Sequence, residues 1–320
     1  ILEVVVMFAS VVIPTYNRKP ILEKCLEALE DQELGGVLER YEVVVIDDGS
    51  TDGTPEWLRA EAQRFPHVRL FEQDHGGPAE GRNNGVRRAL GDVIVFIDSD
   101  LVVTSTFLAC HARALKRAWK GNNARLCFTY GAVINTANFD HPTGERHKLR
   151  DLSWAYFATG NVAIDRHVLE SSGLFDLGFR LYGWEDLELG ERLRRMGVEL
   201  IKCPEAVGYH WHPALSLDQI PNLIRVEGER ARMGLVFYKK HPTRRVRFII
   251  QFTWLHRILW ELLTLGGLIN ETTLRPILRW LIRRGRSGTA MELLRLPLNR
   301  IGVRALFREA KSSGVNCPLL

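Results

Sequence analysis

Short apolar runs alternate with amphipathic segments through the N-terminal third of the chain. The apolar runs are mostly β-branched and only four to six residues long, which suits strands buried on both faces of a sheet. They cover residues 10–14, 41–46, 68–71 and 93–97. Segments 22–29 and 79–90, which lie between these runs, are predicted to be helices. This alternation predicts a doubly wound, mostly parallel α/β sheet with helices on both faces.

A pair of carboxylates closes the strand expected at residues 93–97. Asp98 and Asp100 follow it directly, with Ser99 between them. Open α/β sheets bind ligands outside the carboxyl ends of their strands, so two acidic side chains there can hold a hard cation against a phosphate. The alternative is a strand that simply ends in an Asp-Ser-Asp turn.

Two further strand ends carry polar clusters without a glycine-rich phosphate loop. Residues 15–18 are Thr-Tyr-Asn-Arg, and Asp47 and Asp48 follow the second strand. Neither G-x-G-x-x-G after the first strand nor G-x-x-x-x-G-K-[ST] occurs, which argues against a Rossmann dehydrogenase and a P-loop NTPase. A carboxylate that accepts from a base N–H, together with a metal-binding pair, would instead hold a nucleotide across these strand ends.

Four motifs in this order resemble those of the family 2 inverting glycosyltransferases of the GT-A fold. They occupy residues 10–18, 43–52, 81–85 and 96–100. The resemblance implies a nucleotide-sugar site in which Asp47 or Asp48 contacts the base, while Asp98 and Asp100 handle the ribose and a metal ion. The other implied donor contacts are Pro14, Thr15, Tyr16, Arg82 and Ser99. The expected cofactor is Mn²⁺ or Mg²⁺.

The second half of the chain continues the resemblance. Residues 159–164 resemble the family's acceptor-side strand, which implies acceptor contacts from Gly160 and Asn161. Residues 182–190 are Tyr-Gly-Trp-Glu-Asp-Leu-Glu-Leu-Gly. They resemble a motif shared with galactosyl- and N-acetylgalactosaminyltransferases.

The Glu-Asp pair of this motif is the candidate for a catalytic base. An inverting transferase must remove a proton from the acceptor hydroxyl as that hydroxyl attacks, which requires a carboxylate within hydrogen-bond reach. We expect Asp186 to be this base, Glu185 to hold a neighbouring acceptor hydroxyl, and Trp184 to stack on the sugar. The alternative is that both acids only begin a helix and complement its dipole.

Two histidines follow in the segment Tyr209-His210-Trp211-His212. Histidines at i and i+2 share one face of an extended segment, so either or both could complete a metal site begun by Asp98 and Asp100. His212 is the preferred ligand, and His210 is the second candidate. The alternative for each is a packed or surface histidine.

Composition and cysteine usage indicate a globular protein of a reducing compartment. The chain has 320 residues and 46% hydrophobic content, enough for one large domain with a tail or for two domains. Its five cysteines form no C-x-x-C pair, so neither a zinc site nor a disulfide framework is predicted. No signal peptide is predicted, and residues 1–6 could precede a natural start at Met7. The expected location is cytoplasmic.

Positive charge is concentrated towards the C-terminus. Residues 225–311 hold nineteen Lys or Arg and six Asp or Glu, whereas the whole chain has a net charge of +5. Such a segment favours an anionic partner. An anionic membrane surface, at the inner face of the cell membrane, is preferred to nucleic acid because no nucleic-acid binding motif accompanies the charge.

The C-terminal part is predicted to form basic amphipathic helices. Residues 248–269 are apolar, but His256, Arg257 and Glu261 at their centre argue against a membrane span. Arg257 and Glu261 are expected to pair at i, i+4 on a surface helix. The expected domains are a catalytic domain at 7–222, a helical extension at 223–311 and a disordered tail at 312–320.

The sequence therefore predicts a metal-dependent, inverting hexosyl- or N-acetylhexosaminyltransferase. The expected donor is a nucleotide diphosphate sugar, with a uridine diphosphate sugar preferred, and the expected acceptor is a hydroxyl of a glycan or lipid-linked glycan. One alternative is a sugar-nucleotide nucleotidyltransferase, which would need a glycine-rich basic loop after the first strand. The other is a non-catalytic glycan-binding or membrane-associated module of the same fold, which would have lost the acidic residues.

Overall fold

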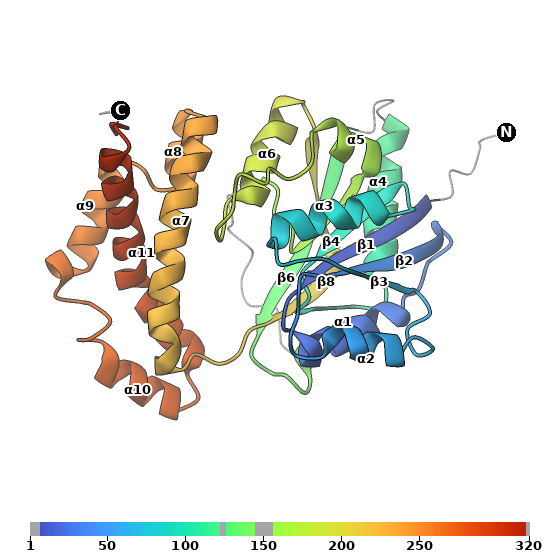
Figure 1. The fold of residues 1–320 in the computed structure, drawn as a ribbon, viewed down its shortest axis with the longest axis horizontal. Helices are drawn as coiled ribbons and strands as arrows, with labels where there is room; N and C mark the ends of the chain where they lie inside the picture. Colours follow the sequence, from blue (N-terminus) through green and yellow to red (C-terminus); the bar gives the residue numbers. More distant parts are fainter. Residues whose placement is uncertain (1–6, 122–125, 145–155, 318–320) are drawn as a thin grey trace. The chain divides into compact units, whose positions relative to one another are not determined.

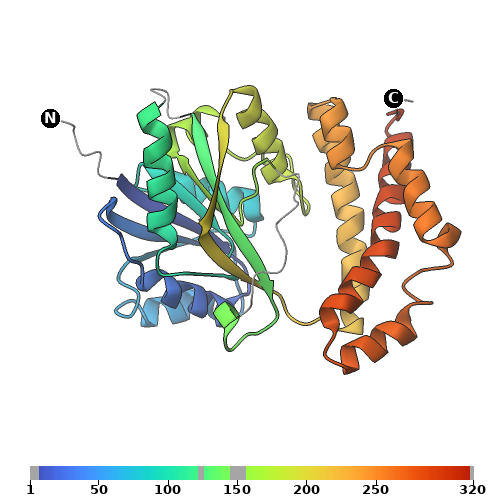
Figure 2. The same cartoon turned by 180° about the vertical axis from the view of Figure 1, so that it is seen from behind.

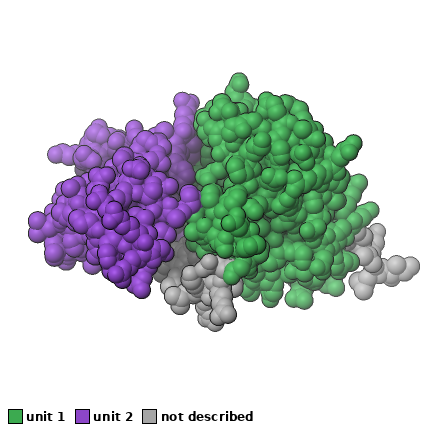
Figure 3. Space-filling view, turned by 90° about the horizontal axis from the view of Figure 1, so that it is seen from below, with its two compact units in different colours: residues 1–178, 185–212 green, residues 179–184, 213–320 purple. Residues whose placement is uncertain are grey.

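The structure is a computed structural model that describes residues 7–121, 126–144 and 156–317 (Figure 1). The chain divides into two compact units (Figure 3). One contains residues 1–178 and 185–212, and the other contains residues 179–184 and 213–320. The expected boundary between a catalytic domain and a helical extension at 222/223 stays a prediction. The expectations for residues 1–6 and for the last three residues of the tail lie outside the described residues.

The first unit is built on one mixed sheet whose strands are mostly parallel. Its order is β3-β2-β1-β4-β7-β6-β8-β5, in which β7 runs antiparallel to β4 and β6, and β5 runs antiparallel to β8. The strands are β1 Met7–Thr15, β2 Leu38–Asp47, β3 Val68–Glu72, β4 Val93–Ile97, β5 Leu101–Val103, β6 Cys127–Thr136, β7 Asn161–Asp165 and β8 Glu199–Trp211. The predicted α/β sheet is confirmed.

Helices cover both faces of this sheet because successive strand residues point to opposite sides. Val11 and Ile13 pack in a core with helices α1 Lys19–Glu30, α2 Thr54–Ala60 and α4 Phe107–Gly121, the last of which is clearest in Figure 2. Val12, between them, packs in a second core on the other face. The helices there are α3 Pro78–Arg88, α5 Arg166–Ser171 and α6 Glu185–Arg195.

The second unit is helical. Its helices are α7 Ile220–Lys240, α8 Arg244–Ile249, α9 Trp254–Leu263, α10 Arg275–Arg283 and α11 Ser287–Ser312. Leu278 and Leu281 of α10 pack with Leu294 and Leu298 of α11 in a core of their own. Among the described residues, no helix is both long and apolar enough to cross a membrane.

One expected contact in this unit is wrong. Arg257 and Glu261 do not pair with each other within the described chain. Glu261 accepts instead from Arg300 and Arg304 of α11, and the Arg257 guanidinium lies 4.9 Å from the Trp254 ring centre. A contact across two helices has replaced the local i, i+4 pair, because Glu261 reaches two arginines on its neighbour.

Candidate active site

The strand ends at one edge of the sheet carry polar atoms that have no partner. Parallel pairing sets Thr15 of β1 directly beside Asp47 of β2. The Thr15 Oγ1 and Asp47 Oδ1 atoms are buried and have no hydrogen-bond partner among the residues described. The other Asp47 oxygen accepts from the Ser50 N–H at 2.9 Å. Buried polar atoms are rarely left unpaired in proteins, so these two are suited to hydrogen bonds with a ligand.

The Asp48 carboxylate, by contrast, accepts hydrogen bonds from other residues of the protein. It accepts from the Gln73 side chain at 2.7 Å and from the N–H groups of Gly76 and Gly77 at 2.8 and 2.9 Å. His75 Nδ1 also lies 2.9 Å from its carboxylate. Asp48 thus shapes the loop after β3, and Asp47 is the freer acceptor.

His75 is a candidate site residue that sequence reasoning missed. Its ring centre lies 4.3 Å from that of Tyr16, which is 44% exposed, so the two rings form a pair beside the strand ends. Residues 73–77 follow β3 directly. Applying to β3 the strand-end rule that picked out the ends of β1, β2 and β4 would have found it.

A buried arginine joins the end of β4 to the start of α6. Arg82 of α3 is 6% exposed and donates to Asp98 and to Glu185, each at 3.1 Å. Burial opposes its charge, but the two carboxylates hold the pKa of Arg82 above its usual value. A Cβ on Gly81 would meet the Pro14 ring at 3.0 Å, so this glycine lets α3 begin close to the end of β1.

The two acids of the Glu-Asp pair lie in different environments at the start of α6. Leu189 and Leu193 are fully buried and fix the helix to the sheet. Glu185 is buried and paired with Arg82. Burial, followed by the negative charge of Glu185, raises the pKa of Asp186 to about 7. One carboxylate is therefore ion-paired with an arginine, while its neighbour titrates near neutrality.

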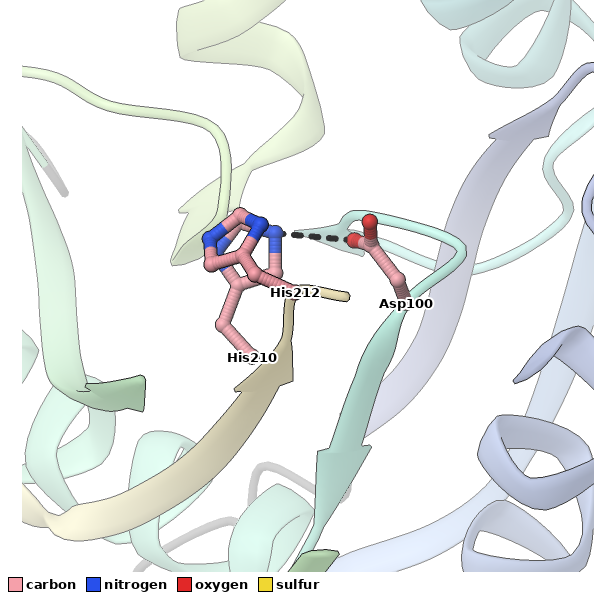
Figure 4. A group of neighbouring side chains, drawn as sticks. All are labelled: Asp100, His210 and His212. Atoms are coloured by element: carbon pink, nitrogen blue, oxygen red, sulfur yellow. Dashed lines mark ion pairs between the residues drawn. The ribbon is translucent and has the colours of Figure 1, made fainter. Parts of the chain in front are cut away.

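Asp100, His210 and His212 form a cluster that could hold a metal ion (Figure 4). Antiparallel pairing of β5 with β8 places Leu101 opposite His210 and so brings the end of β4 to the end of β8. One ligand atom from each of the three residues lies within 4.8 Å of the others. His210 Nε2 is 2.8 Å from Asp100 Oδ1, and the two imidazole centres are 4.1 Å apart.

The charges of this cluster are coupled. Burial alone would raise the pKa of Asp100, but the hydrogen bond from His210 holds it below its usual value. Burial opposes the charge of His210, but the same bond raises the pKa of His210. Burial and the neighbouring His210 lower the pKa of His212 to about 4, which leaves its ring neutral and able to coordinate.

Asp98 and Ser99 lie beside this cluster but do not belong to it. The Asp98 carboxylate accepts from Arg82, and Ser99 is buried, with its carbonyl accepting from the Cys25 thiol at 3.2 Å. A Cβ on Gly160 would lie 3.3 Å from Asp98 Oδ2. The predicted acceptor-side residue Gly160 is therefore next to a predicted donor-side carboxylate.

The Asn161 side chain bonds three other segments of the fold. Its side chain is fully buried and accepts from His111 Nε2 at 2.8 Å while donating to the carbonyls of Ala132 and Ala206 at 2.9 Å. These bonds join α4, β6 and β8 around β7. The expected acceptor contact of Asn161 stays a prediction.

Trp184 belongs to the second unit, and the chain passes back into the first unit between Trp184 and Glu185. The indole N–H donates to the Arg230 carbonyl at 2.7 Å, and the Arg230 guanidinium lies 5.0 Å from the ring centre. Trp184 also lines a small pocket of that unit with Glu227, Gln251 and Asn299. Its expected contact with the acceptor sugar stays a prediction.

A mostly parallel α/β sheet with polar side chains at the carboxyl ends of its strands is a fold that binds ligands at those ends. Residues 10–170, half of the chain, match the profile described as Glycosyl transferase family 2, and the chain belongs to this family. The protein is accordingly a glycosyltransferase.

Curated relatives agree with this membership. The uncharacterized glycosyltransferase YfnE of Bacillus subtilis is 28% identical and matches 67% of this chain and 68% of its own length. Validoxylamine A glucosyltransferase of Streptomyces hygroscopicus subsp. jinggangensis is 31% identical over 73% of this chain but 61% of its own length. Glycosyltransferase AglE of Haloferax volcanii is 36% identical, and the match covers 63% of this chain and 66% of its own length. The matches thus leave about a third of each relative uncovered.

Solved structures support the fold. The mannosyltransferase PcManGT from Pyrobaculum calidifontis, in complex with GDP-Man and Mn²⁺, covers 95% of this chain and 88% of its own, with a TM-score of 0.55 and 21% identity. GalNAc-T7 with UDP, GalNAc and Mn²⁺ covers 70% of this chain and 48% of its own, with a TM-score of 0.50 and 18% identity. The chain shares the GT-A fold of these enzymes.

Proposed function

We propose that the protein is a metal-dependent inverting glycosyltransferase that transfers a hexosyl or N-acetylhexosaminyl group to a hydroxyl of a glycan or lipid-linked glycan. The observation that carries this proposal is the unequal pair at the start of α6. Glu185 is ion-paired with Arg82, whereas the pKa of Asp186 is raised to about 7. A carboxylate poised near neutral pH is suited to take a proton from an acceptor hydroxyl.

The division of labour within the pair follows from their contacts. Asp186 Oδ1 accepts only from the N–H of Leu187 among the described residues, so its other oxygen is free to accept the acceptor proton. Glu185, which is ion-paired with Arg82, serves as a hydrogen-bond acceptor for a neighbouring hydroxyl. Attack from the side opposite the leaving group needs no covalent enzyme intermediate, so one base is sufficient for inversion.

The donor site is proposed at the ends of β1, β2 and β4. The unpaired Asp47 oxygen can accept from an N–H of the base, and the unpaired Thr15 hydroxyl can donate to a base carbonyl. The Tyr16–His75 ring pair offers an aromatic surface for the base to stack on. A uracil ring has one imide N–H flanked by two carbonyls, which suits this set and favours a uridine diphosphate sugar.

Asp100, His210 and His212 are the proposed ligands of a divalent ion. A carboxylate and two imidazoles with other positions open fit Mn²⁺ better than Mg²⁺, because Mg²⁺ prefers an all-oxygen set. A divalent ion bound by these three residues would supply positive charge that stabilises a diphosphate leaving group. Arg82, between Asp98 and Glu185, would keep a fixed positive charge on the same side of the sheet.

Peripheral attachment to an anionic membrane through the C-terminal helices is part of this proposal. Its basis is the net positive charge of residues 225–311. A lipid-linked acceptor would be presented at such a surface.

The function is tested by incubating the full chain with UDP-glucose, UDP-galactose, UDP-GlcNAc or UDP-GalNAc, and separately with GDP-mannose, in the presence of Mn²⁺ or of EDTA. Release of the nucleoside diphosphate from one uridine donor, dependent on Mn²⁺, is the expected result. Release of pyrophosphate from UTP and a sugar phosphate would identify the nucleotidyltransferase alternative. Turnover that is equal with Mn²⁺ and EDTA would refute the metal dependence.

A further inference from the structure

Helix α9 presents its apolar side to solvent. Leu255, Ile258, Leu259 and Leu262 repeat at i, i+3, i+4 and i+7, the spacing of a helix's core-facing stripe. Here the four side chains are 63%, 55%, 41% and 67% exposed, and within the described chain no residue of α9 is buried. The amphipathic pattern is therefore reversed relative to that of an ordinary surface helix.

The polar side of α9 is the side that packs. In Figures 1 and 2 the helix lies alongside α11. Glu261 bonds Arg300 and Arg304 of α11, and the Arg257 guanidinium lies 5.0 Å from the Phe307 ring centre. These contacts fix the rotation of α9 about its own axis, so the apolar stripe faces outward as a consequence of the fold.

The apolar stripe continues beyond the helix. Leu265 and Leu268, in the turn that follows α9, are 62% and 73% exposed. We call Leu255, Ile258, Leu259, Leu262, Leu265 and Leu268 the outer stripe. Isolated exposed apolar residues are common, but a contiguous run of this kind marks an interaction surface.

The charge that follows this stripe in the sequence indicates the kind of partner. After Glu271 the chain contains no acidic residue until Glu292, and it contains five arginines: Arg275, Arg279, Arg283, Arg284 and Arg286. All five are exposed. Trp280 is 47% exposed, and the Arg284 guanidinium lies 4.6 Å from its ring centre. Apolar side chains with neighbouring arginines and a tryptophan are typical of helices that lie in the headgroup region of an anionic bilayer.

We propose that the outer stripe inserts into the interfacial region of an anionic bilayer while the arginines of α10 and of the residues that follow it bind lipid phosphates. This proposal rests on the peripheral membrane attachment in the proposed function, and it identifies the surface that would contact the membrane. A helix of ten residues is about 15 Å long and would lie within one leaflet rather than cross it. In a two-fold dimer the same surface would bring two copies of the arginine-rich segment together, which like-charge repulsion disfavours.

The test is co-sedimentation of the full chain with vesicles of phosphatidylcholine alone or of phosphatidylcholine with phosphatidylglycerol. Binding to the phosphatidylglycerol vesicles is expected at low salt, with partial loss in roughly 0.5 M NaCl because screening weakens only the arginine part. The double variant Leu255→Glu, Leu262→Glu should lower the partition coefficient by a factor on the order of ten to a hundred. Leu90→Glu, at a leucine of the sheet unit with 62% exposure, is the matched control and should bind like the parent.

Three outcomes would overturn the proposal. The parent chain could ignore phosphatidylglycerol vesicles at low salt, or the double variant could bind them as well as the parent does. Alternatively, sedimentation without lipid could show a dimer that the double variant converts to a monomer, which would make the outer stripe a contact between copies. Vesicle binding is measured without donor and donor turnover without vesicles, so failure of this proposal is distinguishable from failure of the proposed transfer reaction.

Discussion

Single side chains carry the chemistry of this protein, and their ionisation decides what they can do. Asp186 and Glu185 are neighbours in the chain, yet only Glu185 has an arginine partner. Burial, followed by the negative charge of Glu185, increases the free energy needed to ionise Asp186. A base of this kind is useful only while it is deprotonated, so the pH dependence of transfer reports on it.

The raised pKa of Asp186 also has a consequence for stability. Its folded-state value, about 7, lies above the usual value for an aspartate, so the ionised carboxylate destabilises the folded state above pH 7. Asp186→Asn should therefore raise the melting temperature at pH 8, and this gain should shrink as the pH falls from 7 towards 4. Calorimetric scans across this range check it. Asp92→Asn, at an exposed position, should show no such pH-dependent gain.

The metal cluster is open to a similar test. His210 must lose its proton to coordinate, and its pKa is raised by Asp100, so Mn²⁺ affinity should fall as the pH is lowered. His210→Ala should weaken Mn²⁺ binding by a factor on the order of a hundred, the upper end of the effect of losing an outer-shell partner. Titration calorimetry with Mn²⁺ alone measures this. His167→Ala, at an exposed histidine of α5, is the control, and equal affinities for both variants would remove His210 from the site.

At the scale of elements, the position of α6 decides where the carboxylate pair points. Gly190 lies on the packed side of this helix, and a Cβ there would be 2.9 Å from the Phe157 Cβ, an atom that cannot move without its backbone. The helix and the segment that leads into β7 thus meet closely at this glycine.

Gly190→Ala is expected to destabilise the protein by about 1–3 kcal/mol through overpacking, and to lower transfer because α6 must shift. Gly228→Ala in α7 makes the same substitution where nothing lies within 4 Å, so it should stabilise by roughly 0.5–1 kcal/mol through helix propensity. Urea unfolding of the two variants measures whether each substitution lowers or raises the free energy of unfolding. A stabilising Gly190→Ala would show that the contact with Phe157 is not tight.

The local patterns of this sequence were enough to predict most strands and helices of the sheet unit. The strands predicted from β-branched runs and the helix beginning at Glu185 are all present. What the patterns could not supply was pairing between distant segments. Asp100 meets His210 because β5 pairs with β8, and no local signal specifies that register.

The same limit applies to other contacts between distant segments. No local pattern indicates the bonds of Asn161 to His111, Ala132 and Ala206. The pattern of α9 predicts an amphipathic helix but not which side packs, and two arginines of α11 decide that. His75 follows β3, so the strand-end rule indicates it, but its ring contact with Tyr16 joins segments far apart in the chain.

At the scale of the whole molecule, the nucleotide and the metal should stabilise the folded chain together. Ligands that bind only the folded state add about 2.7 kcal/mol at a hundredfold excess over the dissociation constant. UDP with Mn²⁺ should therefore raise the melting temperature by several degrees, more than the sum of UDP alone and Mn²⁺ alone. A thermal-shift series with UDP, GDP and CDP checks this. A larger shift with GDP than with UDP would reassign the donor nucleotide.

The identity of the base is the central claim, and transfer rates of two variants test it most directly. Asp186→Asn keeps its shape but loses its basicity, so transfer should fall by a factor on the order of 10² to 10⁴ while donor affinity stays close to that of the parent. Glu185→Gln should mainly raise the KM for the acceptor, because the substitution removes a carboxylate that accepts a hydrogen bond and leaves the proton transfer to Asp186 intact. Near-normal turnover of Asp186→Asn together with an inactive Glu185→Gln would contradict the account and exchange the two roles.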